Sequence, residues 1–268
     1  MQTVVVTGSN GLLGQKLLDK LRDRQALRLI ACARDQNRYP HQDGYTYESV
    51  DITDFDALSK LFDKYEPDVL INSAAMTQVD ACEHEPEQCE AVNVKAVHSI
   101  AGLCKQHDTH LIHLSTDFIF DGEDGPYAEE ATPNPLSFYG HSKLKAEQIV
   151  EKSGARAAIV RTVLVFGVVA DMSRSNIVLW VKGSLEKGKP IAVVDDQFRS
   201  PTLAEDLADG VIAIMFRGKT GVYHISGPEI MSVYDIAVRV ADYFKLDRSL
   251  ISKTDSASLG QAAKRPPK

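Results

Sequence analysis

The 268-residue sequence has few cysteines and no long apolar run. Its four cysteines are spread without a CxxC pair, which argues against a zinc ribbon and against a disulfide framework. We expect reduced, structural thiols and no metal, because the one imaginable cluster, Cys82, His84 and Cys89, lacks a second ligand pair at zinc-finger spacing. The longest apolar runs, near residues 163–166 and 211–216, are far too short to cross a bilayer, so we expect no membrane partner.

The sequence also lacks a run of lysines and arginines. The net charge is -7, and without a basic stripe the chain has no electrostatic footprint for a nucleic acid polymer. It begins with strand-forming residues instead of a charged start and an apolar signal segment, which favours a cytoplasmic protein. With 44% hydrophobic and 25% charged residues, the composition is that of a globular protein of one large or two unequal domains.

A glycine-rich stretch, Gly-Ser-Asn-Gly-Leu-Leu-Gly at residues 8–14, directly follows a β-branched run at residues 3–7. Leucines from Leu13 to Leu21 recur at helical spacing, so the pattern predicts a strand, a tight turn and the start of a helix. Glycine lets backbone N–H groups approach a phosphate, and the helix N-terminus adds unpaired donors. The turn is therefore suited to the diphosphate of a dinucleotide; the alternative is a plain glycine-rich loop.

Strands and helices alternate through the first part of the chain. We expect strands at residues 3–7, 28–33, 45–50, 69–71, 111–114 and 157–161. This alternation predicts an α/β fold, a Rossmann-type doubly wound parallel sheet with right-handed crossovers. Beyond the sixth strand the alternation is less regular. We therefore expect a dinucleotide-binding domain at residues 1–165 and a smaller α/β substrate-binding lobe at residues 166–268, with some exchange of chain between the two.

Local signals mark three of the expected helices. Thr53 is placed to cap the helix that follows it, and Thr202 with Glu205 fits a capping box. The apolar spacing after Pro86 predicts one long helix. Asn93 falls on the apolar face of that helix, where a buried amide needs hydrogen-bond partners.

The ends of the second and fourth strands bear on the cofactor. The second strand ends in Ala33-Arg34, where dinucleotide folds that prefer NAD carry an acidic residue. Arg34 could meet a 2′-phosphate, since its guanidinium matches phosphate well, or it could be a solvated surface arginine. The fourth strand closes on residues 72–75, where Ala74 and Ala75 leave room for a flat ligand; a packing role alone is the alternative.

Three residues at and after the fifth strand are suited to proton transfer. Tyr139 and Lys143 lie at i and i+4 of a predicted helix and share one face, and Thr116 supplies a hydroxyl at the strand end. Bringing a tyrosine pKa from about 10 to near 7 needs roughly 4 kcal/mol, which the Lys143 ammonium and an oxidised nicotinamide could supply. We expect Tyr139 to act as acid or base at a carbonyl oxygen that Thr116 bonds. His110 and His113 point to opposite faces of the strand and are not expected to share a ligand.

Together these motifs resemble the extended short-chain dehydrogenase/reductase family, and within it the dTDP-4-dehydrorhamnose reductase group. The resemblance runs over nearly the whole chain. Its carriers are the stretches at residues 8–14, 51–54, 72–75, 92–93, 114–122, 139–144 with Glu147, 161–162, 196–197, 201–202 and 221–224.

The resemblance implies that the glycine turn cradles the cofactor diphosphate and that Tyr139 and Lys143 serve both the nicotinamide ribose and catalysis. Thr116 and Asp117 would touch the sugar. In the implied reaction, hydride passes to C4 of a nucleotide-linked 4-keto sugar while Tyr139 protonates the oxygen, and no metal is needed. The full set of cofactor-binding candidates is Gly8, Asn10, Gly11, Leu12, Leu13, Arg34, Asp51, Ile52, Ala74, Ala75, Met76, Thr77, Asn93, Leu114, Tyr139 and Lys143.

Three residues depart from the pattern of the group. Leu164 stands where the group usually has a tryptophan that packs on the sugar, which leaves the identity of the sugar open. Met76 stands in place of a tyrosine or histidine. Arg199 replaces a small residue and resembles the pyrophosphate clamp of other extended family members; the alternative is a surface ion pair with Asp195 or Asp196.

We expect an NAD(P)H-dependent reductase of a nucleotide-linked 4-keto-6-deoxysugar, as in dTDP-L-rhamnose synthesis. NADP(H) is the preferred cofactor with NAD(H) as the alternative, and a homodimer is compatible with this activity. One rival is a reductase of a different carbonyl substrate. A second rival is a non-catalytic NADP-binding regulatory subunit similar to that of methionine adenosyltransferase. Whether the chain continues past Lys268 stays open, because the group usually has a short further segment there.

Overall fold

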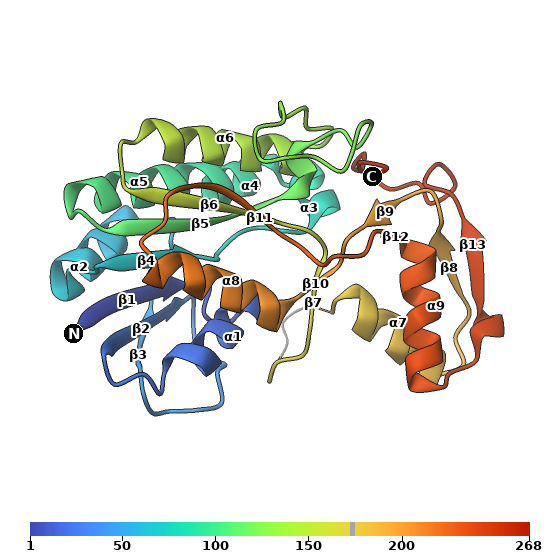
Figure 1. Ribbon diagram of the computed structural model, residues 1–268, viewed down its shortest axis with the longest axis horizontal. Helices are drawn as coiled ribbons and strands as arrows, with labels where there is room; N and C mark the ends of the chain where they lie inside the picture. Colours follow the sequence, from blue (N-terminus) through green and yellow to red (C-terminus); the bar gives the residue numbers. More distant parts are fainter. Residues whose placement is uncertain (172–174) are drawn as a thin grey trace.

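The fold is centred on a parallel sheet of seven strands, in the order β3-β2-β1-β4-β5-β6-β11 (Figure 1). The description rests on a computed structural model, which describes residues 1–171 and 175–268. The order reverses direction at β1, as expected for a doubly wound fold. The strands are β1 (Gln2–Thr7), β2 (Leu27–Ala33), β3 (Thr46–Ser49), β4 (Val69–Asn72), β5 (His110–Thr116), β6 (Ala157–Thr162) and β11 (Gly221–Ile225).

Helices cover both faces of this sheet. Residues of α2, α5 and α6 share one apolar cluster with one face, and residues of α1 and α8 share a second cluster with the other. The predicted Rossmann-type architecture is therefore confirmed. No helix in the described residues has the length and apolarity needed to cross a bilayer. The helices are α1 (Leu12–Leu21), α2 (Phe55–Tyr65), α3 (Val79–His84), α4 (Pro86–Glu90), α5 (Ala96–Gln106), α6 (Phe138–Lys152), α7 (Ile177–Glu186), α8 (Ala204–Phe216) and α9 (Val233–Phe244).

A smaller lobe stands beyond the carboxyl ends of the main strands (Figure 1). It packs α7 and α9 against the parallel pair β8 (Ile191–Val194) and β13 (Ile251–Thr254) around an apolar cluster of its own. Two short pairs connect it: β7 (Val165–Phe166) with β10 (Thr202–Leu203), and β9 (Phe198–Arg199) with β12 (Met231–Ser232). Strand β11 pairs with β6 in the main sheet, and α8 packs on one face of that sheet. The chain therefore crosses between the two parts more than once. The exact domain boundary at residue 165 stays a prediction.

Two of the predicted helix caps are wrong. The N-cap of α2 is Asp54, whose carboxylate accepts from the backbone N–H of Ala57, while Thr53 is held by Asp51 in the preceding turn. Thr202 does not cap α8, because its hydroxyl donates to the carbonyl of Val163 and so ties β10 to the segment between β6 and β7. In both cases a neighbouring polar group competes for the same short side chain.

The predicted long helix after Pro86 is continuous but changes pitch. It runs through α4, a π-helical segment at Ala91–Lys95 and α5. The wider turn includes Asn93, which is 1% exposed and finds the partners that its burial requires. Such π-turns occur often at functional sites.

One buried ion pair ties α6 to the sheet. The Arg161 guanidinium on β6 donates to both carboxylate oxygens of Glu147, at 2.7 Å for the shortest contact. The Ser115 hydroxyl of β5 donates to the same carboxylate. Glu147 is 1% exposed and Arg161 6%, so each charge depends on the other for compensation.

We predict that Glu147→Ala lowers the free energy of unfolding by about 3–5 kcal/mol, because it leaves the Arg161 charge buried without a partner. The pair Glu147→Leu with Arg161→Met should recover most of that loss, since apolar groups of similar size replace both charges. Urea unfolding checks both results. The matched control is Glu186→Ala, which breaks the exposed pair with Lys182 and should cost less than about 1 kcal/mol. An equally small loss for Glu147→Ala would contradict the role given to the buried pair.

Candidate active site

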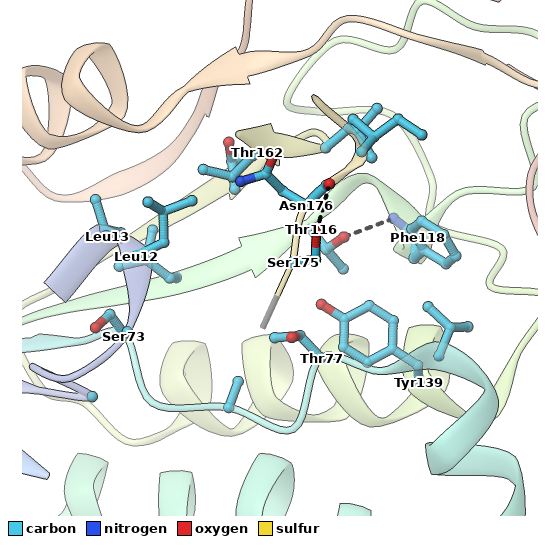
Figure 2. Close-up of a pocket in the computed structure, with 18 of the residues that line it drawn as sticks. Leu12, Leu13, Ser73, Thr77, Thr116, Phe118, Tyr139, Thr162, Ser175 and Asn176 are labelled. Atoms are coloured by element: carbon cyan, nitrogen blue, oxygen red, sulfur yellow. Dashed lines mark hydrogen bonds between the residues drawn. The ribbon is translucent and has the colours of Figure 1, made fainter. Parts of the chain in front are cut away.

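A cavity of about 950 Å³ lies between the carboxyl ends of the main strands and the smaller lobe. Figure 2 shows part of its lining, with Tyr139 reaching from its helix into the cavity and Thr116 on the strand opposite. The structure brings most of the predicted site residues to this one cavity: Gly8, Asn10, Gly11, Leu12, Leu13, Arg34, Asp51, Ile52, Ala74, Ala75, Thr77, Leu114, Thr116, Asp117, Tyr139, Lys143 and Arg199.

The glycine turn forms one end of the cavity. Gly8 has φ +68, and a Cβ there would lie 2.7 Å from the backbone N of Ala74. A Cβ on Gly14 would lie 2.3 Å from the carbonyl oxygen of Gly8, so neither position accepts a side chain. Ser9 Oγ is buried and has no hydrogen-bond partner within the described residues. An unpaired hydroxyl, a close turn and the N-terminus of α1 together fit a bound phosphate group.

The next part of the cavity carries charges of both signs. Arg34, Asp35, Arg38 and Asp51 all line it, and Arg34 Nη1 lies 3.9 Å from Asp51 Oδ2. The Asn10 side chain accepts from the backbone N–H of Arg38 at 2.8 Å and so holds the loop after β2 against the glycine turn. Arg34 is largely exposed, so its guanidinium is free to turn toward an anion.

Tyr139 and Thr116 face each other deep in the cavity. The Tyr139 residue is 7% exposed and Phe118 packs edge-on against its ring at 5.6 Å between centroids. Burial raises the pKa of the Tyr139 phenol, and the Thr116 hydroxyl beside it acts in the opposite direction. For the chain without a cofactor this is opposite to the expected lowering of the pKa. A phenol held protonated can still donate a proton.

Lys143 lies one turn further along α6. Its ammonium donates to the carbonyl of Leu114 at 2.6 Å, and its Nζ lies 3.4 Å from Nε2 of His113. Burial lowers the pKa of Lys143 to about 8, although the nearby Glu147 and Cys89 favour the charged form. Burial thus brings the pKa of this lysine closer to neutral pH than that of an exposed lysine.

Arg199 and Asp117 meet on the substrate side. Arg199 Nε lies 3.9 Å from Asp117 Oδ2, and its terminal nitrogens donate to the carbonyls of Phe198 and Pro266. Burial raises the pKa of Asp117, and the charge of Arg199 opposes that rise. The alternative surface pair of Arg199 is not what the structure has. Of the two expected partners, Asp195 pairs with Lys253 and Asp196 accepts from Ser256.

Two predicted cofactor residues, Met76 and Asn93, are not among the residues that line the cavity. The Asn93 amide accepts from the Met76 backbone N–H at 2.8 Å and donates to the Met76 carbonyl at 2.9 Å. It also donates to Ser142 of α6. Asn93 therefore holds the loop after β4 against the helix that carries Tyr139.

Two of the cysteines, Cys82 and Cys89, which were considered for a metal cluster, pack in an apolar group instead. They form this small group with Tyr139, and Met76 packs against it. In the part of the chain that the structure describes, no three His, Cys, Asp or Glu side chains gather as they would around a metal ion.

Several lining residues of the smaller lobe were not predicted from the sequence, and Trp180 and Arg265 are the two with the clearest chemistry. Trp180, on α7, is 41% exposed and lines the cavity without joining the apolar cluster of the lobe. Arg265 lines it as well and donates to both carboxylate oxygens of Asp80. Trp180 could have been predicted, because it is a lone tryptophan at a polar position of an amphipathic helix. Leu164, noted as a departure, lines the cavity with a positive φ of 37, a conformation rare for leucine.

Comparison with known proteins gives a consistent result over the full length. The family model described as the RmlD substrate binding domain matches residues 1–268. A probable low-salt glycan biosynthesis reductase, Agl14, from Haloferax volcanii is 34% identical, with 97% of this chain and 86% of that protein covered. A dTDP-4-dehydrorhamnose reductase from Aggregatibacter actinomycetemcomitans is 30% identical, with 99% and 89% covered. Methionine adenosyltransferase 2 subunit beta from Xenopus laevis is also 30% identical, with 98% and 78% covered.

Solved structures give the same result. A dTDP-4-dehydrorhamnose reductase from Clostridium acetobutylicum superposes with a TM-score of 0.88 at 28% identity, covering 99% of this chain and 88% of that one. The enzyme of that name from Bacillus anthracis, in complex with NADP, superposes with a TM-score of 0.86 at 26% identity, covering 100% and 89%. Since the family model spans every residue, the chain belongs to the RmlD substrate-binding domain family, within the extended short-chain dehydrogenases/reductases.

Proposed function

We propose that the protein is an NAD(P)H-dependent oxidoreductase that reduces the 4-keto group of a nucleotide-linked deoxysugar. One observation carries this proposal: Thr116, Tyr139 and Lys143 line the same cavity as the glycine turn. The relatives named as dTDP-4-dehydrorhamnose reductases support the substrate class. dTDP-4-dehydrorhamnose is the specific substrate that we propose.

The cofactor would occupy the part of the cavity between the glycine turn and Tyr139. The backbone of residues 11–13 at the start of α1 would hold the diphosphate, with Ser9 Oγ as a further donor. The small side chains of Ala74 and Ala75 would leave room for the nicotinamide side. We propose residues 1–165 as the cofactor domain and 166–268 as the substrate lobe. Strand β11 falls in the second range but pairs with β6 in the main sheet.

When bound, the reduced nicotinamide supplies the hydride. The chain itself supplies the proton and the polar contacts at the carbonyl. The Tyr139 phenol would donate its proton to the oxygen at C4, and the Thr116 hydroxyl would bond the same oxygen. The Lys143 ammonium would hold the nicotinamide ribose and stabilise the phenolate that remains. The low exposure of Tyr139 and Lys143 would limit the access of water to this proton transfer.

The substrate side would recognise a nucleoside diphosphate. Arg199 would bond diphosphate oxygens by exchanging its contacts with the Phe198 and Pro266 carbonyls, and Asp117 would bond the sugar. Trp180 would provide an aromatic surface on which the nucleobase stacks. The substrate would thus lie between the lobe and Tyr139.

A second candidate is a non-catalytic NADP-binding subunit, since the methionine adenosyltransferase subunit is as similar to this chain as the reductase is. Turnover decides between the two. A subunit of that kind binds NADPH but oxidises none across a panel of 4-keto nucleotide sugars. The same panel, run with both cofactors, tests the rival in which another carbonyl compound is the substrate.

We predict that Tyr139→Phe lowers kcat for reduction of dTDP-4-dehydrorhamnose by at least about 100-fold and leaves the NADPH Kd within about threefold, because only the proton donor is lost. Stopped-flow NADPH oxidation and fluorescence titration measure the two quantities. Tyr65→Phe is the control, since that hydroxyl bonds Glu48 at the far end of α2. Equal turnover by wild type and Tyr139→Phe would sink the assigned acid.

Trp180 offers a second test, because it is the single tryptophan of the chain. We predict that dTDP quenches its fluorescence in a saturable way, as a nucleobase stacks on the indole. Trp180→Leu should raise KM for the nucleotide sugar about 10-fold and change kcat by less than about twofold, since the lost contact is remote from the reacting carbon. Fluorescence that is unchanged at saturating dTDP contradicts the stacking.

Arg34 carries the proposed preference for NADP(H). We predict that Arg34→Ala raises the NADPH Kd about 10-fold, roughly 1.4 kcal/mol, and leaves the NADH Kd nearly unchanged, because only NADPH has the 2′-phosphate. Isothermal titration with both cofactors gives the two ratios. Arg28→Ala is the matched control, as Arg28 lies on β2, which ends just before Arg34, but its guanidinium packs over the Tyr65 ring and does not line the cavity. A parallel loss for both cofactors would show that Arg34 does not read the 2′-phosphate.

A further inference from the structure

A row of buried polar side chains crosses three neighbouring strands beneath the cavity. Thr7 of β1, Asn72 of β4 and His113 of β5 are paired in register across the sheet. All three are at most 1% exposed. The Thr7 hydroxyl lies 2.7 Å from one amide atom of Asn72, and the other amide atom lies 3.1 Å from Nδ1 of His113. A polar row in the centre of a sheet costs stability unless every member is satisfied.

The row ends at Lys143. Nε2 of His113 lies 3.4 Å from the Lys143 Nζ, whose other contact is the Leu114 carbonyl at 2.6 Å. His110, on the opposite face of the same strand, contacts the Lys219 carbonyl. The two histidines therefore have separate partners, as predicted, and only His113 reaches the proposed proton-transfer set.

Hydrogen-bond chemistry selects one arrangement of this row. Burial and the charge of Lys143 hold the pKa of His113 well below its usual range, so the ring is neutral and carries one proton. If that proton were on Nε2, a donor would face the Lys143 ammonium, which has only donors. If the proton is on Nδ1, Nε2 accepts from the ammonium and Nδ1 donates to the Asn72 oxygen. Rotating the Asn72 amide by 180° gives this pattern without moving its heavy atoms.

We propose that His113 is a positioning residue for Lys143. Its neutral imidazole accepts a hydrogen bond from the Lys143 ammonium through Nε2, and Asn72, held by Thr7, fixes the ring in the Nδ1–H form. Together with the Leu114 carbonyl, this acceptor aims Nζ and stabilises its charge. What Lys143 then does for the reaction rests on the proposed function.

The groups around Lys143 set the direction of the pH effect. Those that face it are Tyr139 and Glu147 on its own helix, His113 on β5 and Cys89 on α4, with Glu147 paired to Arg161 of β6. Removing a neutral acceptor from the ammonium favours the uncharged amine. The pKa of Lys143, lowered to about 8 by burial, should therefore fall further when His113 is lost.

The first experiment needs neither substrate nor cofactor. Long-range ¹⁵N–¹H NMR of the imidazoles in the cofactor-free protein identifies the tautomer of His113, with His113→Gln giving the assignment by difference. We expect the neutral Nδ1–H form at pH 7. The Nε2–H form, or an imidazolium, overturns the proposal whatever the enzyme turns over.

The second experiment is the pH profile of kcat/KM for reduction. The rate should fall on the alkaline side as the ammonium is lost, near pH 8 in the wild type. In His113→Leu, kcat/KM should begin to fall at a pH about one unit lower than in the wild type, so that this alkaline limb of the profile shifts. His113→Gln should restore the limb, because its amide can accept from Lys143 and donate to Asn72. His110→Leu removes an equally buried histidine from the same strand and should leave the limb in place.

A limb that stays in place in His113→Leu, with only activity or stability reduced, overturns the proposal, since a merely structural role predicts that result. If the wild type turns over no 4-keto nucleotide sugar, the proposed function fails instead, and the tautomer still decides the role of His113.

Discussion

Burial of the polar face of α6 is the constraint on which the site depends. Tyr139, Lys143 and Glu147 follow one another at intervals of four residues along that face, and they are 7%, 2% and 1% exposed. Ionised groups in apolar surroundings cost several kcal/mol unless they are paired and hydrogen-bonded. The partners come from the sheet: Arg161 of β6 for the carboxylate, and the Leu114 carbonyl of β5 for the ammonium. Compensation of charge therefore fixes how the helix lies on β5 and β6.

The same compensation brings the glycine turn and the polar face of α6 into one cavity. Gly8 lies against Ala74 at a separation that a side chain would abolish, which keeps the ends of β1 and β4 together. Asn93 then ties the loop after β4 to Ser142 on α6. These two contacts connect the end of β1 to the loop after β4, and that loop to α6, so that all three line one cavity. Tyr139 is the exception, because burial raises its pKa and, among residues 1–171 and 175–268, no lysine or arginine bonds its hydroxyl.

Much of this could be predicted from the sequence because it depends on local period and on residue type. Alternation of strands and helices predicted the sheet, and the four-residue spacing put Tyr139 and Lys143 on one face. The prediction failed where it had to choose between neighbouring residues. Thr53 was predicted to cap α2, but the geometry of the preceding turn makes Asp54 the cap. The buried position of Asn93 was predicted from the spacing, but the π-helical pitch there and its partner, the Met76 backbone, are not registered by period counting. The contact of His113 with Lys143 depends on the packing of α6 over β5, which no sequence pattern encodes.

The energetic cost of the α6 face also bears on the choice between a catalyst and a binding subunit. Binding a dinucleotide uses the glycine turn, an open cavity and, in our proposal, the Lys143 ammonium at the nicotinamide ribose, but it gives no task to the proton of the buried Tyr139 phenol. A proton donor at a developing alkoxide, in contrast, needs a dry site and a cation close by. The retained burial of Tyr139 and Lys143 together therefore favours a protein that performs the reduction over one that only binds its cofactor.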